Sequence, residues 1–199
     1  MLFRSLRLLG LDPGTATFGW GVVEASGGRP LHIAHGAIRT AATAQLGERL
    51  IEMRDELERL LRLHRPDRIA IERIYVQGNT QSAIAIGAAR GVALLVAADA
   101  QMPVIEATTS EMKRAIAGSG RADKRAVARA VTKILGLDRT PTPDDAADAL
   151  GLALWGCGAA RLLISAGSSR FDRSSARGKA EESGFDRAVR RALGLKRGA

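Results

Sequence analysis

The sequence predicts an α/β domain with a mixed five-stranded sheet flanked by helices. Three strand-like apolar segments come first, and short apolar strands then alternate with helical segments. Strands that follow one another directly pair as antiparallel hairpins, whereas strands separated by a helix need a crossover and run parallel. The 199 residues suit one domain, which we expect at 1–165, followed by a tail at 166–199.

The first three strands are expected at 6–11, 18–24 and 31–40. The turn "DPG" separates the first two, and "SGGRP" separates the second from the third. Apolar residues then recur at helical spacing over 45–65, with charged residues on the opposite face. Pro66 ends that helix.

The later elements alternate between strand and helix. "RIAIE" (68–72) and "PVIEA" (103–107) are short apolar strands, and 79–101 between them predicts a long apolar helix. Three more helices are expected at 109–117, 123–136 and 143–165, the last with Thr142 as N-cap and Pro143 as its first residue. From Ala166 the apolar content is too low for a core, which predicts a flexible tail.

Charge and cysteine content narrow the setting of the protein. The formal net charge is +9, and residues 166–199 carry +5 of it, with nine Lys/Arg against four Asp/Glu. Nucleic acid is the leading partner for such a surface, and plain solvation is the alternative. The single cysteine, Cys157, and the absence of an 18-residue apolar run predict a soluble protein of the reducing cytoplasm, with no membrane partner.

Four carboxylates occupy positions at which packing has no use for a charge. Asp12 follows the strand at 6–11, Glu72 ends "RIAIE", and Asp145 and Asp148 share one helical face at i and i+3. Alternatives remain: Asp12 opens a turn, and Glu72 forms a salt bridge to an arginine. Asp144 and Asp145 fall in the first turn of a helix, where the dipole favours an anion; that is a sufficient account of Asp144.

If the four acids converge, they predict a site for hard divalent cations. Oxygen ligands favour Mg²⁺ or Mn²⁺ over zinc, and the three histidines, His32, His35 and His64, lie in other segments. Two such ions can activate a water molecule and stabilise the leaving oxygen of a phosphodiester. The residues therefore predict a metal-dependent nuclease.

Four segments together resemble one family, RuvC, the bacterial Holliday junction resolvases. They are "GLDPGTATFGWGVV", "IAIERIYVQGNTQSAIAIGAARGVAL", "MKRAIAGSGRADK" and "DDAADALGLAL", and they span about residues 8–154 in the family's order. The resemblance implies a ribonuclease H-like fold and a homodimer that nicks opposing strands of a four-way DNA junction in homologous recombination and DNA repair. It also implies a branch-migration complex of RuvA- and RuvB-type proteins as partner.

The resemblance assigns roles to the acids and to several basic residues. It makes Asp12, Glu72, Asp145 and Asp148 the catalytic ligands of two Mg²⁺ ions, replaceable by Mn²⁺, with 5′-phosphate and 3′-hydroxyl products. Lys113 and Lys124 match basic positions near the scissile phosphate; a solvated helix face is the alternative. Additional DNA-backbone contacts are expected from Arg114, Arg121 and Arg125.

Two further expectations concern the junction and the dimer. Tyr75 matches an aromatic position, commonly Phe, that inserts at the junction and stacks on a base; a buried tyrosine with a bonded hydroxyl is the alternative. Ala83, Gly87 and Gly91 recur every four residues and form a groove for a second helix. The family builds its dimer interface from this helix, while packing against the protein's own sheet is the alternative.

Three other functions compete with this one. "LDPGT" resembles the first phosphate loop of actin-like kinases and chaperone ATPases, but we find no second glycine-rich loop. Nucleases that trim ribosomal RNA precursors share the fold, yet they lack the long helix written here as "GNTQSAIAIGAARGV". A non-enzymatic junction-binding module would have no reason to keep four buried anions.

Overall fold

The computed structural model describes residues 5–14, 16–27, 29–73 and 80–171. Tyr75, the first residues of the chain and most of the predicted tail lie outside these ranges. The elements follow in the order β1 (Leu6–Asp12), β2 (Thr17–Ser26), β3 (Arg29–Arg39), α1 (Leu46–His64), β4 (Arg68–Glu72), α2 (Thr80–Asp99), β5 (Val104–Ala107), α3 (Thr109–Ala117), α4 (Lys124–Leu135) and α5 (Asp144–Phe171). The predicted α/β class is confirmed.

The sheet is mixed and five-stranded, with the strand order β3-β2-β1-β4-β5. β1 and β2 pair antiparallel, as do β2 and β3, because short turns join them directly. β4 pairs parallel with β1 and with β5, since α1 and α2 carry the chain back across the sheet before each parallel strand. β1 and β4 are thus central, and their carboxyl ends lie side by side.

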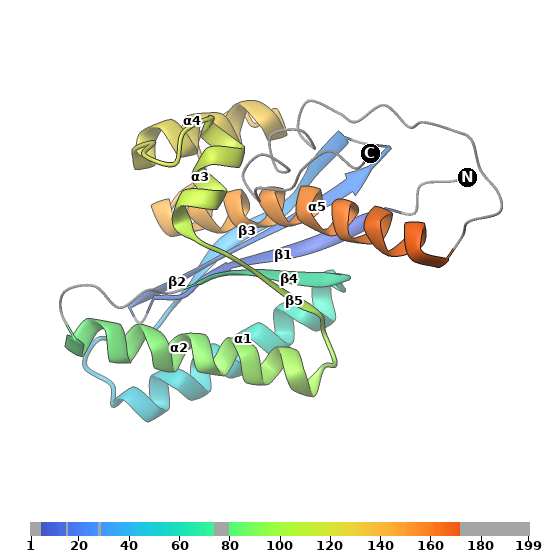
Figure 1. Ribbon diagram of the computed structural model, residues 1–199. Coiled ribbons are helices and arrows are strands. Elements are labelled where there is room, and N and C mark those ends of the chain that lie inside the picture. Colours follow the sequence, from blue (N-terminus) through green and yellow to red (C-terminus); the bar gives the residue numbers. More distant parts are fainter. Residues whose placement is uncertain (1–4, 15, 28, 74–79, 172–199) are drawn as a thin grey trace.

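Helices cover both faces of the sheet in two layers (Figure 1). Alternate residues of the strands face opposite layers: Leu9, Leu11 and Phe18 are buried in one apolar cluster with residues of α1 and α2. Leu8 and Val23 belong to the other cluster, which they share with residues of α3, α4 and α5. In the described part of the chain, no helix has both the length and the apolar character that a membrane span requires.

α5 lies unusually close to β1 and β2 because glycines face it. A Cβ at Gly10 would lie 1.9 Å from the carbonyl oxygen of Ala149, and one at Gly19 would lie 2.2 Å from that of Asp145. Only a residue without a side chain permits such an approach of backbone to backbone. These contacts fix the first turns of α5 directly over the end of β1.

The ends of α5 differ from the sequence prediction. The helix begins at Asp144, and the amide of Ala146 donates to the carbonyl oxygen of Pro143 at 3.0 Å. Pro143 therefore precedes the first helical residue, so the assignment of Thr142 as N-cap is wrong. At the other end α5 continues to Phe171 instead of stopping near 165, since no proline interrupts it and each added residue adds a helical bond.

Candidate active site

The ends of three elements bring the four predicted carboxylates together. β1 and β4 are in register, with Leu11 beside Ile71, so the next residues, Asp12 and Glu72, emerge side by side towards the α5 layer. Asp12 pairs across β1 and β2 with Gly19, whose Cα lies against the backbone of Asp145.

Asp148 follows Asp145 one turn further along α5, and its charge acts on Asp12. Asp12, Glu72 and Asp145 line one cavity, and the charges of Glu72, Asp148 and Asp145 all raise the pKa of Asp12, so the four carboxylates face one region, called the acid cluster below.

Burial and mutual repulsion destabilise the charged forms of two carboxylates in this cluster, Asp12 and Asp148. Burial, followed by the charges of Glu72, Asp148 and Asp145, raises the pKa of Asp12 to about 8. Burial is also the main cause that raises the pKa of Asp148, with smaller contributions from Glu72 and Asp145, whereas Lys124 and Lys113 oppose the shift. The cluster holds more negative charge than its surroundings compensate, and a bound cation would relieve that excess.

Two neighbours engage individual carboxylates. The Thr109 hydroxyl, at the start of α3, donates a hydrogen bond to the Glu72 carboxylate. The Lys124 ammonium, at the start of α4, lies 3.8 Å from the Asp148 carboxylate, whose side chain is 18% exposed. As the side chains stand, no three Asp, Glu, His or Cys residues of the described ranges form a ready metal site. Thr109 and Lys124 each contact one carboxylate, and a bound metal ion would compete with them for those carboxylate oxygens.

The residues nevertheless fit divalent cations of the magnesium type. The ligand set is all oxygen, and a cavity of about 920 Å³ opens beside it, lined by Asp12, Glu72 and Asp145 together with Gly14 and Thr109. The histidines lie elsewhere: His32 and His35 pair with each other on β3, and His64 ends α1.

The predicted basic residues divide into two groups. Lys124 pairs with Asp148, and the charges of Lys124 and, to a smaller extent, Lys113 lower the pKa of that carboxylate, against the rise that burial causes. Arg125 borders a second pocket that Asp148 also lines. Arg114 and Arg121 are exposed on α3 and on the turn before α4, and they line neither of these two cavities.

The three small residues predicted for the dimer interface lie on α2. Gly87 and Gly91 are exposed, and a Cβ at either would meet nothing within 4 Å. The sheet is instead contacted by the opposite side of α2, where Ala89 and Ala93 are buried. The alternative that this stripe packs against the protein's own sheet is therefore wrong for Gly87 and Gly91.

Sequence reasoning missed two residues that support Glu72. One is Thr109; the other is Arg90 of α2, whose Nε donates to the backbone carbonyl of Glu72 at 3.2 Å and whose guanidinium pairs with Glu106 at 2.8 Å. Thr109 depends on the position of β5 next to β4, where Ala107 lies beside Glu72, and Arg90 depends on the packing of α2 on the sheet. Thr109 follows Ala107 by two residues, but only the strand order reveals that proximity.

A mixed sheet with carboxylates at the ends of two central strands and on the helix that crosses them defines a nuclease of the ribonuclease H-like class. The model of one family, crossover junction endodeoxyribonuclease RuvC, matches residues 8–155. Relatives of that name from Desulfitobacterium hafniense and Rubrobacter xylanophilus are 40% and 46% identical over 158 and 147 residues. These alignments cover 79% and 74% of this chain, and 96% and 82% of the relatives.

Solved structures agree with this assignment. Thermus thermophilus RuvC, 31% identical, superposes with a TM-score of 0.73, and its complex with a Holliday junction substrate, 32% identical, with 0.75. Each comparison covers 79% of this chain and 96% of the other. The chain belongs to the RuvC family of crossover junction endodeoxyribonucleases. It is therefore a metal-dependent endonuclease that resolves Holliday junctions. The alternative hypotheses of an actin-like kinase or ATPase and of a non-enzymatic junction-binding module are wrong.

Proposed function

We propose that Asp12, Glu72, Asp145 and Asp148 bind two Mg²⁺ ions and thereby catalyse hydrolysis of a DNA phosphodiester at a four-way junction. The observation that carries this is the convergence of the four carboxylates: burial, and then the repulsion from the other three, raise the pKa of Asp12 to about 8. The ions would supply an activated water and stabilise the leaving oxygen, giving a 5′-phosphate and a 3′-hydroxyl. Mn²⁺ has the same preference for oxygen ligands and would replace Mg²⁺.

The protein's own residues bind and orient the DNA strand. Lys124 and Lys113 flank Asp148 and offer cations to a phosphate at the cluster. Thr109 orients the Glu72 carboxylate from one side, and the hydrogen bond from Arg90 fixes the backbone of Glu72. Arg114, Arg121, Arg125 and Tyr75 would add contacts to the DNA beyond the cleaved bond.

The assembly that we propose is a cytoplasmic homodimer. Two identical copies related by a twofold axis would present two acid clusters symmetrically, as paired nicks in opposing strands require. The exposed Gly87 and Gly91 of α2 support this interface. A branch-migration complex of RuvA- and RuvB-type proteins would deliver the junction, and the basic segment 166–199 would add affinity for phosphates that does not depend on sequence.

A synthetic four-way junction tests the catalytic assignment. Wild type with Mg²⁺ or Mn²⁺ should nick opposing strands symmetrically, with the ends mapped on sequencing gels. Asp148→Asn removes one charge at constant size, and nicking should fall by roughly a thousandfold or more while junction binding stays nearly intact. Asp144→Asn, the same change one turn earlier, should cut within a few-fold of wild type. Equal loss of binding and cleavage in Asp148→Asn would instead indicate a structural role.

RNA substrates separate this function from that of the ribosomal RNA trimming nucleases. The junction should be cut, whereas single-stranded RNA ends should remain intact under the same conditions. Trimming of RNA ends at a comparable rate would contradict the proposed DNA substrate.

A further inference from the structure

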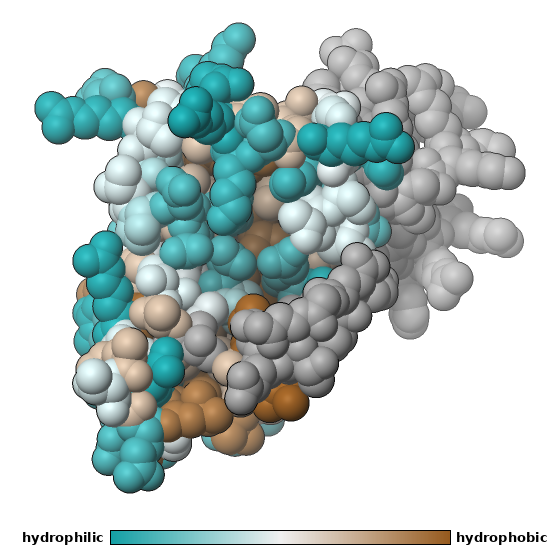
Figure 2. Space-filling view, turned by 90° about the vertical axis from the view of Figure 1, so that its left-hand side faces the viewer, coloured by the Kyte–Doolittle hydropathy of each residue, from teal (hydrophilic) through white to brown (hydrophobic). Residues whose placement is uncertain are grey.

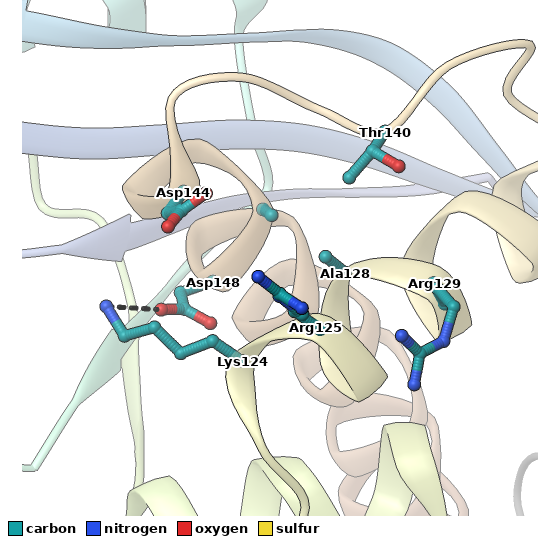
Figure 3. A pocket seen from close by; sticks show the side chains of 8 residues that line it. Lys124, Arg125, Ala128, Arg129, Thr140, Asp144 and Asp148 are labelled. Carbon is teal, nitrogen blue, oxygen red and sulfur yellow. Dashed lines mark ion pairs between the residues drawn. The ribbon is translucent and has the colours of Figure 1, made fainter.

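A second pocket lies between α4 and the start of α5, next to the acid cluster. It encloses about 240 Å³ and is bordered by Lys124, Arg125 and Arg129 of α4, Thr140 of the preceding loop, and Asp144 and Asp148 of α5 (Figure 3). Asp148 and Lys124 border this pocket, whereas Asp145 lines the acid-rich cavity. The two cavities therefore both border the first turns of α5, over residues 144–148.

The pocket offers two uncommitted guanidinium groups. Arg125 and Arg129 are four residues apart and so project from the same face of α4, one turn from each other. Both are exposed, and neither makes a hydrogen bond or an ion pair with another described residue. Figure 3 shows both side chains beside the pocket, with the small Ala128 between them and Thr140 across from them.

One acid of the pocket, Asp148, is paired with a lysine, and the other, Asp144, lies at the start of a helix. Lys124 lies 3.8 Å from the Asp148 carboxylate, and Asp144 sits in the first turn of α5, where the helix dipole favours a negative charge. Two arginines and a hydroxyl therefore remain for a ligand. Guanidinium groups bind phosphate oxygens through paired, charge-assisted hydrogen bonds, and a hydroxyl adds a further donor.

We propose that this pocket binds a backbone phosphate of the strand being cut, adjacent to the scissile phosphate, through Arg125, Arg129 and Thr140. The inference rests on the proposed function, since the acid cluster defines where the scissile phosphate lies. A strand that places one phosphate at the acids would pass the pocket within the next nucleotides, because both cavities border the first turns of α5 and Asp148 of the acid cluster lines the pocket. Such a contact fixes the register of the strand without reading its bases.

The test is a protein–DNA double-variant cycle. A set of four-way junctions is prepared, each with one neutral methylphosphonate. The modification stands at one of the two phosphates on either side of the scissile phosphate. Binding of full-length protein is measured with divalent ions chelated, so that the DNA stays intact. For wild type, one flanking methylphosphonate should weaken binding by roughly tenfold, the size of a charge-assisted contact. The double variant Arg125→Ala/Arg129→Ala should bind the unmodified junction about as weakly as wild type binds the modified one. A methylphosphonate at the same position should then weaken its binding little further.

A matched control separates a local contact from general charge. Arg54→Ala/Arg62→Ala also removes two positive charges, but from exposed positions on α1, on the other face of the sheet. This control should keep the full methylphosphonate effect. The salt dependence of binding should become shallower by roughly 0.9 for each lost phosphate contact in the α4 variant.

Two results would overturn the proposal. One is that the loss of affinity from the arginine substitutions and the loss from the methylphosphonate simply multiply at every position, which would mean that the two changes are independent. The other is an equal loss of affinity and of methylphosphonate sensitivity in the α1 control. Failure of the proposed function would appear separately, as undiminished nicking by Asp148→Asn, whatever the cycle gives.

Discussion

Thr109 shows how one hydroxyl can orient a carboxylate of the proposed metal site. It follows β5 by two residues and donates a hydrogen bond to Glu72 across the gap between β5 and β4. Glu72 is thereby held from its side chain by Thr109 and from its backbone by Arg90. Groups that orient a metal-binding carboxylate in this way affect metal affinity, although they do not touch the metal themselves.

Removing that hydroxyl should raise the metal requirement of the enzyme. We expect Thr109→Val, which keeps the branched shape, to need roughly tenfold more Mg²⁺ for half-maximal nicking of a four-way junction. Thr109→Ser should restore the wild-type requirement. Thr132→Val is the matched control, because the Thr132 hydroxyl donates to the carbonyl of Ala128 within its own helix, α4. An unchanged or lower Mg²⁺ requirement in Thr109→Val would show that Thr109 does not position Glu72.

At the scale of elements, the contact of α5 with β1 and β2 determines the position of two of the four acids. Gly10 lies where a Cβ would come within 1.9 Å of the Ala149 carbonyl oxygen and 2.6 Å of the Ala153 amide. Both neighbours are helix backbone and cannot move aside singly. A methyl group here must push the whole helix away from the sheet, together with Asp145 and Asp148.

Gly10→Ala should therefore be strongly destabilising. We expect a loss of about 3 kcal/mol or more in the free energy of unfolding, the upper end for overpacking a core, measured by urea titration. Gly47→Ala on α1 is the control, since a Cβ there meets nothing within 4 Å and alanine favours the helix. A loss below about 1 kcal/mol for Gly10→Ala would mean that α5 can shift without cost.

The elements were predictable from sequence because each reflects a local pattern. The predicted helix at 109–117 coincides with α3, and "RIAIE" coincides with β4, since apolar periodicity and strand length carry that information. The four acids could be found because each is out of place in such a pattern. Thr109 and Arg90 could not, because the first lies near Glu72 through the pairing of β4 with β5 and the second through the packing of α2 on the sheet.

β3 contains a pair of histidines that the strand geometry brings together. A register shift between Val22 and Val23 inserts one extra residue opposite them, so His32 and His35, three apart, share a face. Nε2 of His32 lies 2.8 Å from Nδ1 of His35, a hydrogen bond that requires one ring to be neutral. Burial lowers the pKa of both, and the charge of His35 lowers that of His32 further.

The pair should make stability depend on pH. Both histidines have a pKa below the ordinary 6.5 in the folded protein. Between those folded values and pH 6.5, the unfolded chain therefore binds more protons than the folded one. The stabilisation is complete above pH 6.5 and is lost as the pH falls through the folded values. Urea titrations at pH 7.5 and 5.5 should show a smaller decrease for His32→Gln/His35→Gln than for wild type. His64→Gln should keep the contribution of the pair, and identical decreases in the double variant and wild type would contradict this.

At the scale of the whole molecule, the surface carries a hydrophobic patch. Figure 2 shows mostly hydrophilic side chains over the upper part, where α3 and α4 lie, and a hydrophobic patch at the bottom centre, over the layer of α1 and α2, with hydrophilic side chains to its left. On α2 the exposed apolar residues follow one face: Ile84 is 65% exposed and Leu95 56%, with Gly87 and Gly91 between them. A continuous apolar face of this kind indicates an interface, and the proposed twofold dimer would cover it.

Gly91→Glu should break that dimer while leaving each chain folded. A Cβ at Gly91 meets nothing within 4 Å in the single chain, so the substitution adds a charge on the exposed face where the second α2 would lie. Sedimentation equilibrium should show a shift from the mass of two chains towards that of one. On a cruciform plasmid the variant should give mainly nicked circles, because paired nicks need both clusters bound at once.

Gly47→Glu, a change of equal charge at an open position on α1, should stay dimeric and linearise the plasmid. A Gly91→Glu protein that remains dimeric would place the interface on another surface. The two acid clusters would then need a different symmetry axis to meet opposing strands, since the position of that axis relative to Asp12 and Asp148 sets the distance between the two cuts.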